Sequence, residues 1–328
     1  MALDIWLASL LSCPIDGSDL RVLDDDLECE QCHTFPVVDG VPVLLREDVP
    51  PTHPAIQKTL SEVRENRVDS LRLPQSADGI DPVVQIVVSA TCGRLYAPLV
   101  NTLERYPIPR SRLPAGDGKT LLDIGCNWGR WTFSAARQGY RAIGIDPDLG
   151  PVLAAKRIAT QLGIEAHFVV GDARWLPFKS TRFDSVFSYS VIQHFSKGDA
   201  RLAIADAGRV LKRGGTATIQ MPNAYGIRNI AHQVTHRRPQ SFDVRYWTPG
   251  ELEQTFIRLV GPTRLSVDGF FGLGIQPDDV DMLPLRFQLV VKSSEALRSA
   301  ARRFPPLRFV ADSLYATSEK TSARGDDG

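Results

Sequence analysis

The feature that most constrains the fold of this 328-residue chain is the stretch LLDIGCNWG, residues 121–129. A short apolar run enters a glycine-bearing turn, and a helical pattern opens at Arg130. A strand–turn–helix unit of this kind brings backbone N–H groups and a helix N-terminus close to a ligand. Gly125 and Gly129 allow a close approach of the backbone, and the carboxylate of Asp123 suits an amino or cationic ligand group. The spacing differs from the Gly-x-Gly-x-x-Gly of a dinucleotide site, which disfavours a dehydrogenase.

Acidic residues also end the next two predicted strands. Asp146 ends strand 141–146, about 20 residues beyond the glycine turn, where a carboxylate binds ribose hydroxyls in nucleotide-binding units. Asp172 ends the strand that begins at residue 166. Further strands are predicted at 183–190 and 216–221, with helical patterns at 151–162 and 199–211. This alternation predicts an α/β fold with a parallel, doubly wound sheet.

These motifs, in this order, resemble those of the class I S-adenosylmethionine-dependent methyltransferases that act on metabolites, lipids and sugars. The matching segments are 121–129, 144–146, 170–173, 182–186 and 211–215. The resemblance covers residues 82–320 and implies a Rossmann-like, mostly parallel sheet of seven strands. Asn127 replaces the middle glycine of the family's first motif. Because Asn tolerates left-handed backbone, we expect the turn to survive this replacement.

The resemblance implies S-adenosyl-L-methionine as the cofactor and a role for each acidic residue. Asp123 would orient the methionine amino group, directly or through water. Asp146 would accept from both ribose hydroxyls, and Asp172 from the adenine amino group. Helix capping or turn formation is the structural alternative for all three. The predicted cofactor-binding residues are Asp123, Gly125, Cys126, Asn127, Gly129, Asp146, Pro147, Asp172, Ala173, Arg174 and Ser188.

Candidate acceptor residues follow the fourth strand and lie in an insertion. His194 is a candidate general base, because its ordinary pKa suits proton transfer near neutral pH, although the family often keeps a structural histidine there. Tyr96, on a helix before the first strand, would touch the methionine end of the ligand or pack in the core. The insertion 222–246 would recognise an acceptor phosphate or carboxylate, or form a solvated basic helix. Its predicted substrate-binding residues are Arg228, His232, Arg245 and Tyr246.

The N-terminal segment resembles the zinc-ribbon proteins that accompany or activate methyltransferases. Cys13, Cys29 and Cys32 match the ribbon's ligand positions, and Asp16 stands at the second one. Zinc accepts carboxylate oxygen, so a site of Cys13, Asp16, Cys29 and Cys32 is predicted, with His33 as a second candidate for the fourth ligand. The alternative is a degenerate ribbon without metal. This module would also offer a surface for a protein partner.

The predicted organisation has four parts. A small β ribbon module spans residues 1–48, and a linker with one short helix near residues 56–65 spans 49–81. The methyltransferase domain spans 82–320, with acceptor-side insertions at 222–246 and 277–306. Its last predicted elements are a helix at 293–304 and a strand at 309–316. Residues 321–328 are predicted to be a disordered tail.

Composition bounds the partners and the compartment. Basic and acidic residues balance at 38 each, so no global positive field attracts nucleic acid. No apolar run approaches the ~18 residues of a membrane span, and no signal peptide is apparent. Five cysteines without a disulfide-like framework favour the cytoplasm.

The predicted function is methyl transfer to a small-molecule, sugar or lipid-linked acceptor at oxygen. Related quinone-pathway enzymes hold a metal with carboxylates after the fourth strand, whereas this chain has Ser190 and Gln193 there, which disfavours metal-dependent O-methylation. One alternative is an rRNA or tRNA base methyltransferase with an N-terminal zinc module. The other is a non-catalytic scaffold that binds a partner protein.

Overall fold

A computed structural model of the protein describes residues 3–23, 26–71, 79–235, 244–272, 274 and 276–321. Its strands form one continuous sheet of eleven in the order β1-β2-β3-β4-β7-β6-β5-β8-β9-β11-β10. The strands are β1 (Leu20–Leu23), β2 (Asp26–Cys29), β3 (Thr34–Val38), β4 (Val41–Leu44), β5 (Thr120–Ile124), β6 (Arg141–Asp146), β7 (Ala166–Gly171), β8 (Phe183–Ser188), β9 (Leu211–Pro222), β10 (Thr263–Gly269) and β11 (Ser313–Glu319).

The seven strands from β7 to β10 form the mostly parallel sheet that the sequence predicts. Five of these strands run parallel to one another, in the order β7, β6, β5, β8 and β9. β11 lies antiparallel between β9 and β10. Strand order reverses beside β5, so the carboxyl ends of β5 and β8 flank the switch point where open α/β sheets bind ligands.

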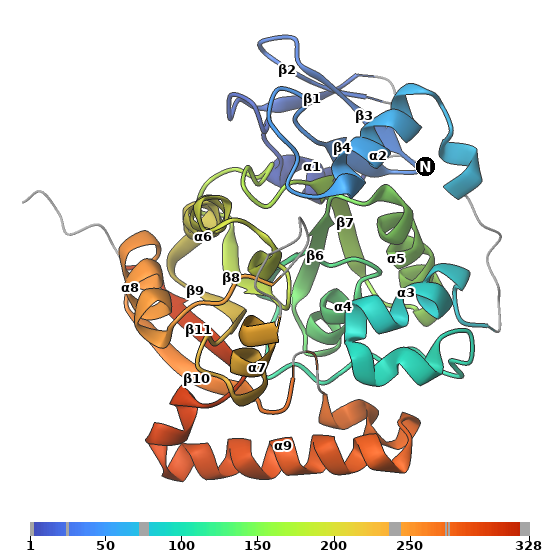
Figure 1. Ribbon diagram of the computed structural model, residues 1–328. Coiled ribbons are helices and arrows are strands. Elements are labelled where there is room, and N and C mark those ends of the chain that lie inside the picture. Colours follow the sequence, from blue (N-terminus) through green and yellow to red (C-terminus); the bar gives the residue numbers. More distant parts are fainter. Residues whose placement is uncertain are drawn as a thin grey trace, which may run out of the picture.

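The N-terminal ribbon adds its strands to one edge of this sheet. β1 to β4 pair antiparallel in sequence order. β4 then pairs parallel with β7, with Val43 opposite Val170 and Leu44 opposite Gly171 (Figure 1). The ribbon therefore covers the edge that β7 would otherwise expose, and it reaches the strand that leads into Asp172.

Helices cover both faces of the sheet. Their bounds are α1 (Ile5–Leu10), α2 (Pro54–Arg64), α3 (Pro82–Cys92), α4 (Arg130–Arg137), α5 (Leu149–Leu162), α6 (Lys197–Val210), α7 (Ile227–Thr235), α8 (Pro249–Leu259) and α9 (Leu285–Arg303). Side chains alternate across β5: Leu122 and Ile124 pack with α1, α6 and α8, whereas Leu121 packs with α4 on the other face. α2, α3 and α5 share that second face with α4.

The predicted linker helix is α2, which His53 caps through a bond from the Ala55 N–H to Nδ1. A capping box begins α8: Thr248 accepts from the N–H of Glu251, Glu251 accepts from the N–H of Thr248, and Pro249 occupies the first turn. α2 begins two residues before the predicted linker helix near residues 56–65.

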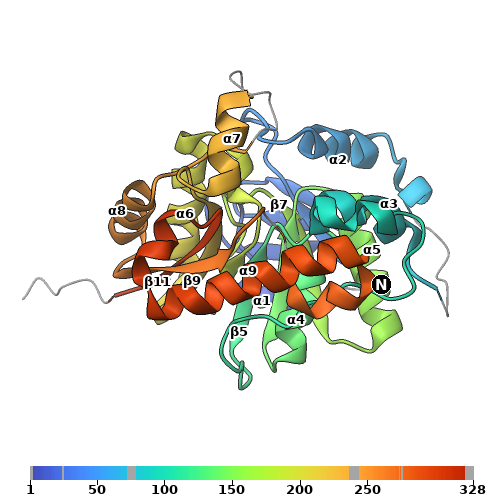
Figure 2. The ribbon, with the colours of Figure 1, turned by 60° about the horizontal axis from the view of Figure 1, so that its bottom comes forward.

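The C-terminal elements differ from the predicted bounds. α9 begins at Leu285, eight residues before the predicted start, and crosses the molecule beside β10 (Figure 2). β11 runs over Ser313–Glu319 and not over 309–316, because Pro305–Phe309 forms a short 3₁₀ helix, η5. The predicted tail lies outside the described residues from 322 onward. Among the described helices, none is long and apolar enough to cross a membrane.

Candidate functional site

A cavity of about 350 Å³ opens at the carboxyl ends of β5, β6, β7 and β8. Four segments from outside these strand ends complete its wall: the start of α2, the end of α3, the start of α4 and the turn after β8. The lining residues are Thr52, His53, Ala90, Thr91, Cys92, Gly93, Ile124, Gly125, Cys126, Asn127, Trp128, Arg130, Trp131, Ile145, Asp146, Pro147, Asp148, Gly171, Asp172, Ala173, Tyr189, Ser190, Val191, Gln193, His194, Phe195 and Gly274.

The turn after β5 is held tightly against β6. The N–H groups of Gly125 and Cys126 both donate to the carbonyl of Ile145, over 2.8 and 3.0 Å. Gly125 has φ +77°, and a Cβ there would collide with the side chain of Val191. Asn127 adopts the left-handed conformation with φ +47°, which confirms that the turn tolerates this replacement of glycine.

Asp146 ends β6 and presents its carboxylate at the cavity wall. The carboxylate accepts from the N–H of Asn127 and from the N–H of Asp148, both over 3.0 Å. Burial raises its pKa to about 7 despite these two hydrogen bonds. One carboxylate is thus fixed beside the glycine turn, with its remaining acceptor capacity available to a ligand diol.

The structure does not bring Asp123 into the cavity wall. Its buried carboxylate accepts from the Thr132 hydroxyl over 2.7 Å, which joins β5 to α4. Burial raises its pKa to about 7. Two other predicted residues also lie behind the wall: Ser188 donates to the carbonyl of Ile124, and Gly129 precedes α4 with φ +87°.

Asp172 lines the cavity with Ala173, but its carboxylate is already engaged. The Arg174 backbone N–H donates to it over 2.9 Å, and the Arg174 guanidinium donates over 2.8 to 3.2 Å. The same guanidinium also binds Asp199 and the carbonyl of Pro50. Arg174 therefore lies behind Asp172 and does not flank the cavity, in contrast to the sequence prediction.

Arg130 is a cavity residue that sequence reasoning missed. It is the first residue of α4, and its buried guanidinium pairs with Asp279 over 2.6 Å and donates to the Pro107 carbonyl over 2.7 Å. Its Nη1 is buried and has no hydrogen-bond partner among the described residues. An arginine directly after the glycine turn was the available signal. A buried donor of this kind calls for an anionic or carbonyl oxygen from the ligand.

Tyr96 acts behind Arg130 and not at the wall. Its hydroxyl donates to Asp279 over 2.5 Å and accepts from Arg130 Nη2 over 3.1 Å. Asp279 belongs to the short helix η4 (Pro277–Met282) in the C-terminal excursion. Tyr96 is therefore packed in the core behind the cavity wall, which is the alternative to its predicted contact with the ligand.

Comparisons with known proteins agree with the residues that build this cavity. A family model described as a methyltransferase domain matches residues 121–215, which run from β5 through the turn before the main part of β9. The ubiquinone biosynthesis O-methyltransferase of Azorhizobium caulinodans is 33% identical over 114 residues, which cover 35% of this chain and 40% of that protein. Residues 121–215 of this chain therefore match a methyltransferase domain, in agreement with the family expected from the sequence motifs.

Other proteins that this chain resembles carry different names. The probable tRNA methyltransferase 9B of Homo sapiens is 34% identical over 127 residues, which cover 38% of this chain and 26% of that protein. A solved complex of the Haloferax volcanii Trm112 methyltransferase activator with a putative methyltransferase is 16% identical, with a TM-score of 0.46; the match covers 84% of this chain and 100% of that chain. The matched regions of the two curated relatives span less than half of their length.

The turn after β8 forms a further side of the cavity. Ser190 has φ +59°, and its N–H and hydroxyl both bind Gln220 Oε1. Gln193 Nε2 lies 3.2 Å from His194 Nε2, while the buried Gln193 Oε1 has no hydrogen-bond partner in the part of the chain that the structure describes. His53 faces the same cavity from the start of α2. No local sequence pattern predicts His53 as a site residue. Its position at the cavity depends on the path that residues 46–53 take past the carboxyl ends of the strands.

The predicted substrate-binding residues of the insertion lie outside the cavity wall. Arg228 donates to the carbonyl of Phe271 over 2.8 Å. His232 Nδ1 lies 3.0 Å from the hydroxyl of Tyr246. The backbone N–H of Arg245 donates to the carbonyl of Gln193, which joins the insertion to the turn after β8. Residues 236–243 of the insertion lie outside the described part of the chain.

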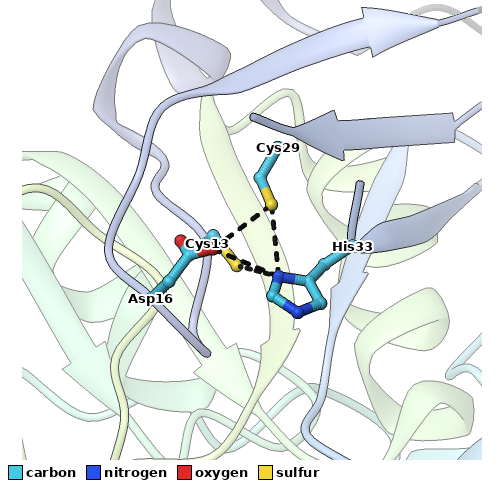
Figure 3. A group of neighbouring side chains, drawn as sticks. All are labelled: Cys13, Asp16, Cys29 and His33. Atoms are coloured by element: carbon cyan, nitrogen blue, oxygen red, sulfur yellow. Dashed lines mark hydrogen bonds and ion pairs between the residues drawn. The ribbon is translucent and has the colours of Figure 1, made fainter. Parts of the chain in front are cut away.

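A second group of ligand-forming side chains lies in the ribbon, where Cys13, Asp16, Cys29 and His33 converge (Figure 3). His33 Nδ1 lies 3.2 Å from Cys29 Sγ, 3.7 Å from Cys13 Sγ and 3.2 Å from Asp16 Oδ2. Tetrahedral zinc with bonds of about 2.0 to 2.3 Å separates its ligand atoms by roughly 3.3 to 3.8 Å. The chemistry and the spacing of the four donors therefore fit zinc.

The fourth member of this group differs from the primary prediction. Cys32 is exposed and has φ +60°, and its N–H donates to the carbonyl of Cys29. That tight turn carries the chain on to His33, whose ring completes the group in place of the Cys32 thiol. His33, the second candidate for the fourth ligand in the sequence analysis, is therefore the residue that lies in the group.

Proposed function

We propose that this chain transfers the methyl group of S-adenosylmethionine to a small-molecule acceptor, at an acceptor oxygen. Sugars and lipid-linked molecules belong to the proposed acceptor class. The observation that carries the proposal is the placement of Asp146: a fixed carboxylate lies at the cavity wall, bound by the backbone of the glycine turn. The ribose hydroxyls of the cofactor would donate to this carboxylate.

The remaining cavity groups suit the methionine end of the cofactor. The partnerless Nη1 of Arg130 would bind the methionine carboxylate, because an arginine fork matches a carboxylate in charge and geometry. Asp279 and Tyr96 hold the guanidinium from behind, so the arginine is oriented before the cofactor arrives. Asp123 would act on the methionine end only through the turn that it braces with Thr132.

The adenine end would lie near Asp172 and Ala173. Since Arg174 occupies the Asp172 carboxylate, backbone groups of this segment would contribute to adenine recognition more than the carboxylate does. Trp131 and Tyr189 form an aromatic wall, with ring centroids 4.6 Å apart, on the side of the α4 start. Such a wall excludes water from the reacting centre.

Methyl transfer from the sulfonium is an in-line displacement. The carbon–sulfur bond breaks as a carbon–oxygen bond forms, and the sulfonium becomes the neutral thioether of S-adenosylhomocysteine. The protein aligns donor and acceptor, because the methyl group is already activated. The acceptor hydroxyl loses its proton to His194, which lines the acceptor side. The activity described for the A. caulinodans relative supports oxygen as the acceptor atom.

We also propose that Cys13, Asp16, Cys29 and His33 hold a structural zinc ion. Two turns pre-form the group: the N–H of Cys13 donates to Ser18, and the N–H of Cys29 donates to His33. Asp16 Oδ1 accepts from the N–H and the hydroxyl of Ser18, which orients the carboxylate as an outer-shell partner orients a metal ligand. The other carboxylate oxygen, Oδ2, is the one that faces His33. Zinc would join the loop before β1 to the end of β2 and stabilise the ribbon.

Transfer of labelled methyl groups tests the proposed function. The full chain is incubated with S-adenosyl-[methyl-³H]methionine and fractionated cell extract, and the label is followed into RNA, lipid and soluble small molecules. Label in the lipid or small-molecule fraction is the expected result. Label confined to RNA would establish the base-methylating alternative, and no transfer with any fraction would favour the scaffold.

A further inference from the structure

Helix α7 exposes its apolar residues to solvent and buries a polar one, the opposite of the usual arrangement of a surface helix. Its apolar residues Ile227, Ile230 and Val234 recur at helical spacing on one face and are exposed to 52%, 49% and 61%. The residue that it buries is polar: Asn229 is 5% exposed and donates to the carbonyls of Asn223 and Asp312. The helix is therefore fastened by hydrogen bonds and turns its apolar face outward.

The exposed surface continues into the segment before β11. The N–H of Ile227 donates to the carbonyl of Val310, so the two segments lie side by side. Phe309 and Val310 are exposed to 45% and 40%. We call Ile227, Ile230, Val234, Phe309 and Val310 the α7 apolar surface. Figure 2 shows α7 standing at one extremity of the molecule.

The two segments that carry this surface contain basic residues and no acidic ones. Residues 223–235 and 304–311 contain no Asp or Glu. Arg228 and Arg308 are exposed beside the apolar residues, and Arg302 and Arg303 precede the second segment at the end of α9. Exposed apolar side chains surrounded by arginines match the acyl boundary and headgroups of an anionic bilayer.

We propose that the α7 apolar surface docks on the surface of an anionic lipid membrane. The apolar side chains would enter the interface, while the arginines bind lipid phosphates. This docking goes beyond methyl transfer and does not depend on it. One consequence does rest on the proposed function: the Arg245 N–H to Gln193 carbonyl bond joins the insertion to the acceptor side, so a docked enzyme would draw its acceptor from the membrane.

Sedimentation with vesicles tests the docking. The full chain is mixed with vesicles of phosphatidylcholine alone and of phosphatidylcholine with phosphatidylglycerol. We expect binding to the anionic vesicles and a decrease of that binding as salt is raised. The variant Ile230→Gln/Val234→Gln should weaken the binding roughly tenfold or more, because two buried apolar side chains are lost.

A matched variant distinguishes docking through the α7 apolar surface from nonspecific binding through any exposed apolar side chain. Leu202→Gln/Ile257→Gln changes two equally exposed side chains on α6 and α8 and should bind vesicles as the unaltered chain does. Equal loss in both variants, or no vesicle binding by the unaltered chain, would overturn the proposal. So would a shift from dimer to monomer in the α7 variant by analytical ultracentrifugation, since the surface would then join two copies.

Titration of the same samples with S-adenosylhomocysteine separates this proposal from the proposed function. Vesicle binding without cofactor binding would contradict the proposed methyl transfer and leave the docking proposal standing. Cofactor binding without vesicle binding would contradict the docking alone. The α7 variant should bind S-adenosylhomocysteine with unchanged affinity, because its residues lie outside the cavity wall.

Discussion

Asn127 donates its backbone N–H to the carboxylate of Asp146 over 3.0 Å, and both residues line the same cavity. The residue that departs from the family's glycine-rich turn thus fixes the carboxylate proposed to bind the ribose. Asn127 makes this bond from the left-handed conformation, with φ +47°. The turn and the carboxylate therefore form one unit of the site.

The affinity for S-adenosylhomocysteine should rise with pH between about 6 and 8. Burial raises the pKa of Asp146 to about 7, and ribose hydroxyls donate more strongly to the ionised carboxylate. Below that pKa, the affinity should fall by up to about tenfold per pH unit. Calorimetry across this range measures the effect. Asp123→Asn should keep the pH dependence, whereas a flat profile in the unaltered chain would contradict the role of Asp146.

The buried carboxylates of Asp123 and Asp146 should make the ligand-free chain less stable as pH rises. The folded-state pKa of Asp123 and of Asp146 is about 7, above the ordinary value of 3.8. Because the folded state binds these protons more tightly, their contribution to the free energy of unfolding is complete below about pH 4 and is lost as pH approaches 7. Urea unfolding at several pH values measures this. In Asp123→Asn, the decrease should be smaller.

The ligand's carboxylate should account for much of its affinity through Arg130. We expect the unaltered chain to bind S-adenosylmethionine roughly tenfold or more tightly than decarboxylated S-adenosylmethionine, since a charge-assisted hydrogen bond contributes about 1.5 to 3 kcal/mol. Arg130→Met/Asp279→Asn removes the arginine without leaving an unpaired buried charge. That variant should bind the two ligands alike. A preference that persists in the variant would place the carboxylate elsewhere.

Purified protein should contain about one zinc ion per chain by elemental analysis. Cys29→Ser should abolish the zinc content and lower the thermal midpoint of the ribbon, because the metal's binding energy contributes to folding. Cys32→Ser is the matched control and should keep its zinc, since that thiol lies outside the group. Zinc loss in Cys32→Ser would restore Cys32 as the fourth ligand.

His194→Ala should reduce kcat of methyl transfer by about 10²- to 10⁴-fold, the usual contribution of a general base. The affinity for S-adenosylhomocysteine should not change, because His194 lies on the acceptor side of the cavity. Steady-state transfer of the labelled methyl group measures kcat once an acceptor fraction is known, and single-turnover transfer isolates the rate of the chemical step. An unchanged rate would show that solvent or another group takes the proton.

The sequence predicted those features that depend on local pattern. Apolar runs that end in an acidic residue placed β5, β6 and β7, and the spacing of Asp146 from the glycine turn placed its carboxylate at the cavity. Strand and helix alternation predicted the parallel, doubly wound sheet, because parallel pairing requires such crossovers. The number of seven strands followed from the family resemblance.

Long-range contacts account for the features that pattern could not predict. Tyr96 and Asp279 are 183 residues apart, and only their meeting makes Arg130 a fixed donor. The pairing of Asp172 with Arg174 depends on Asp199 and Pro50, which hold the guanidinium in place. The choice of His33 over Cys32 depends on one backbone turn, because a single positive φ angle decides which side chain faces inward.

Calorimetric titration of the full chain with S-adenosylhomocysteine tests the central claim most directly. We predict binding by the unaltered chain and a loss of roughly tenfold to a hundredfold in affinity for Asp146→Ala, which removes the acceptor for two ribose hydroxyls. Circular dichroism should show that the variant keeps its fold. Equal affinity in the two proteins, or no binding by the unaltered chain, would contradict the assignment of this cavity to the cofactor.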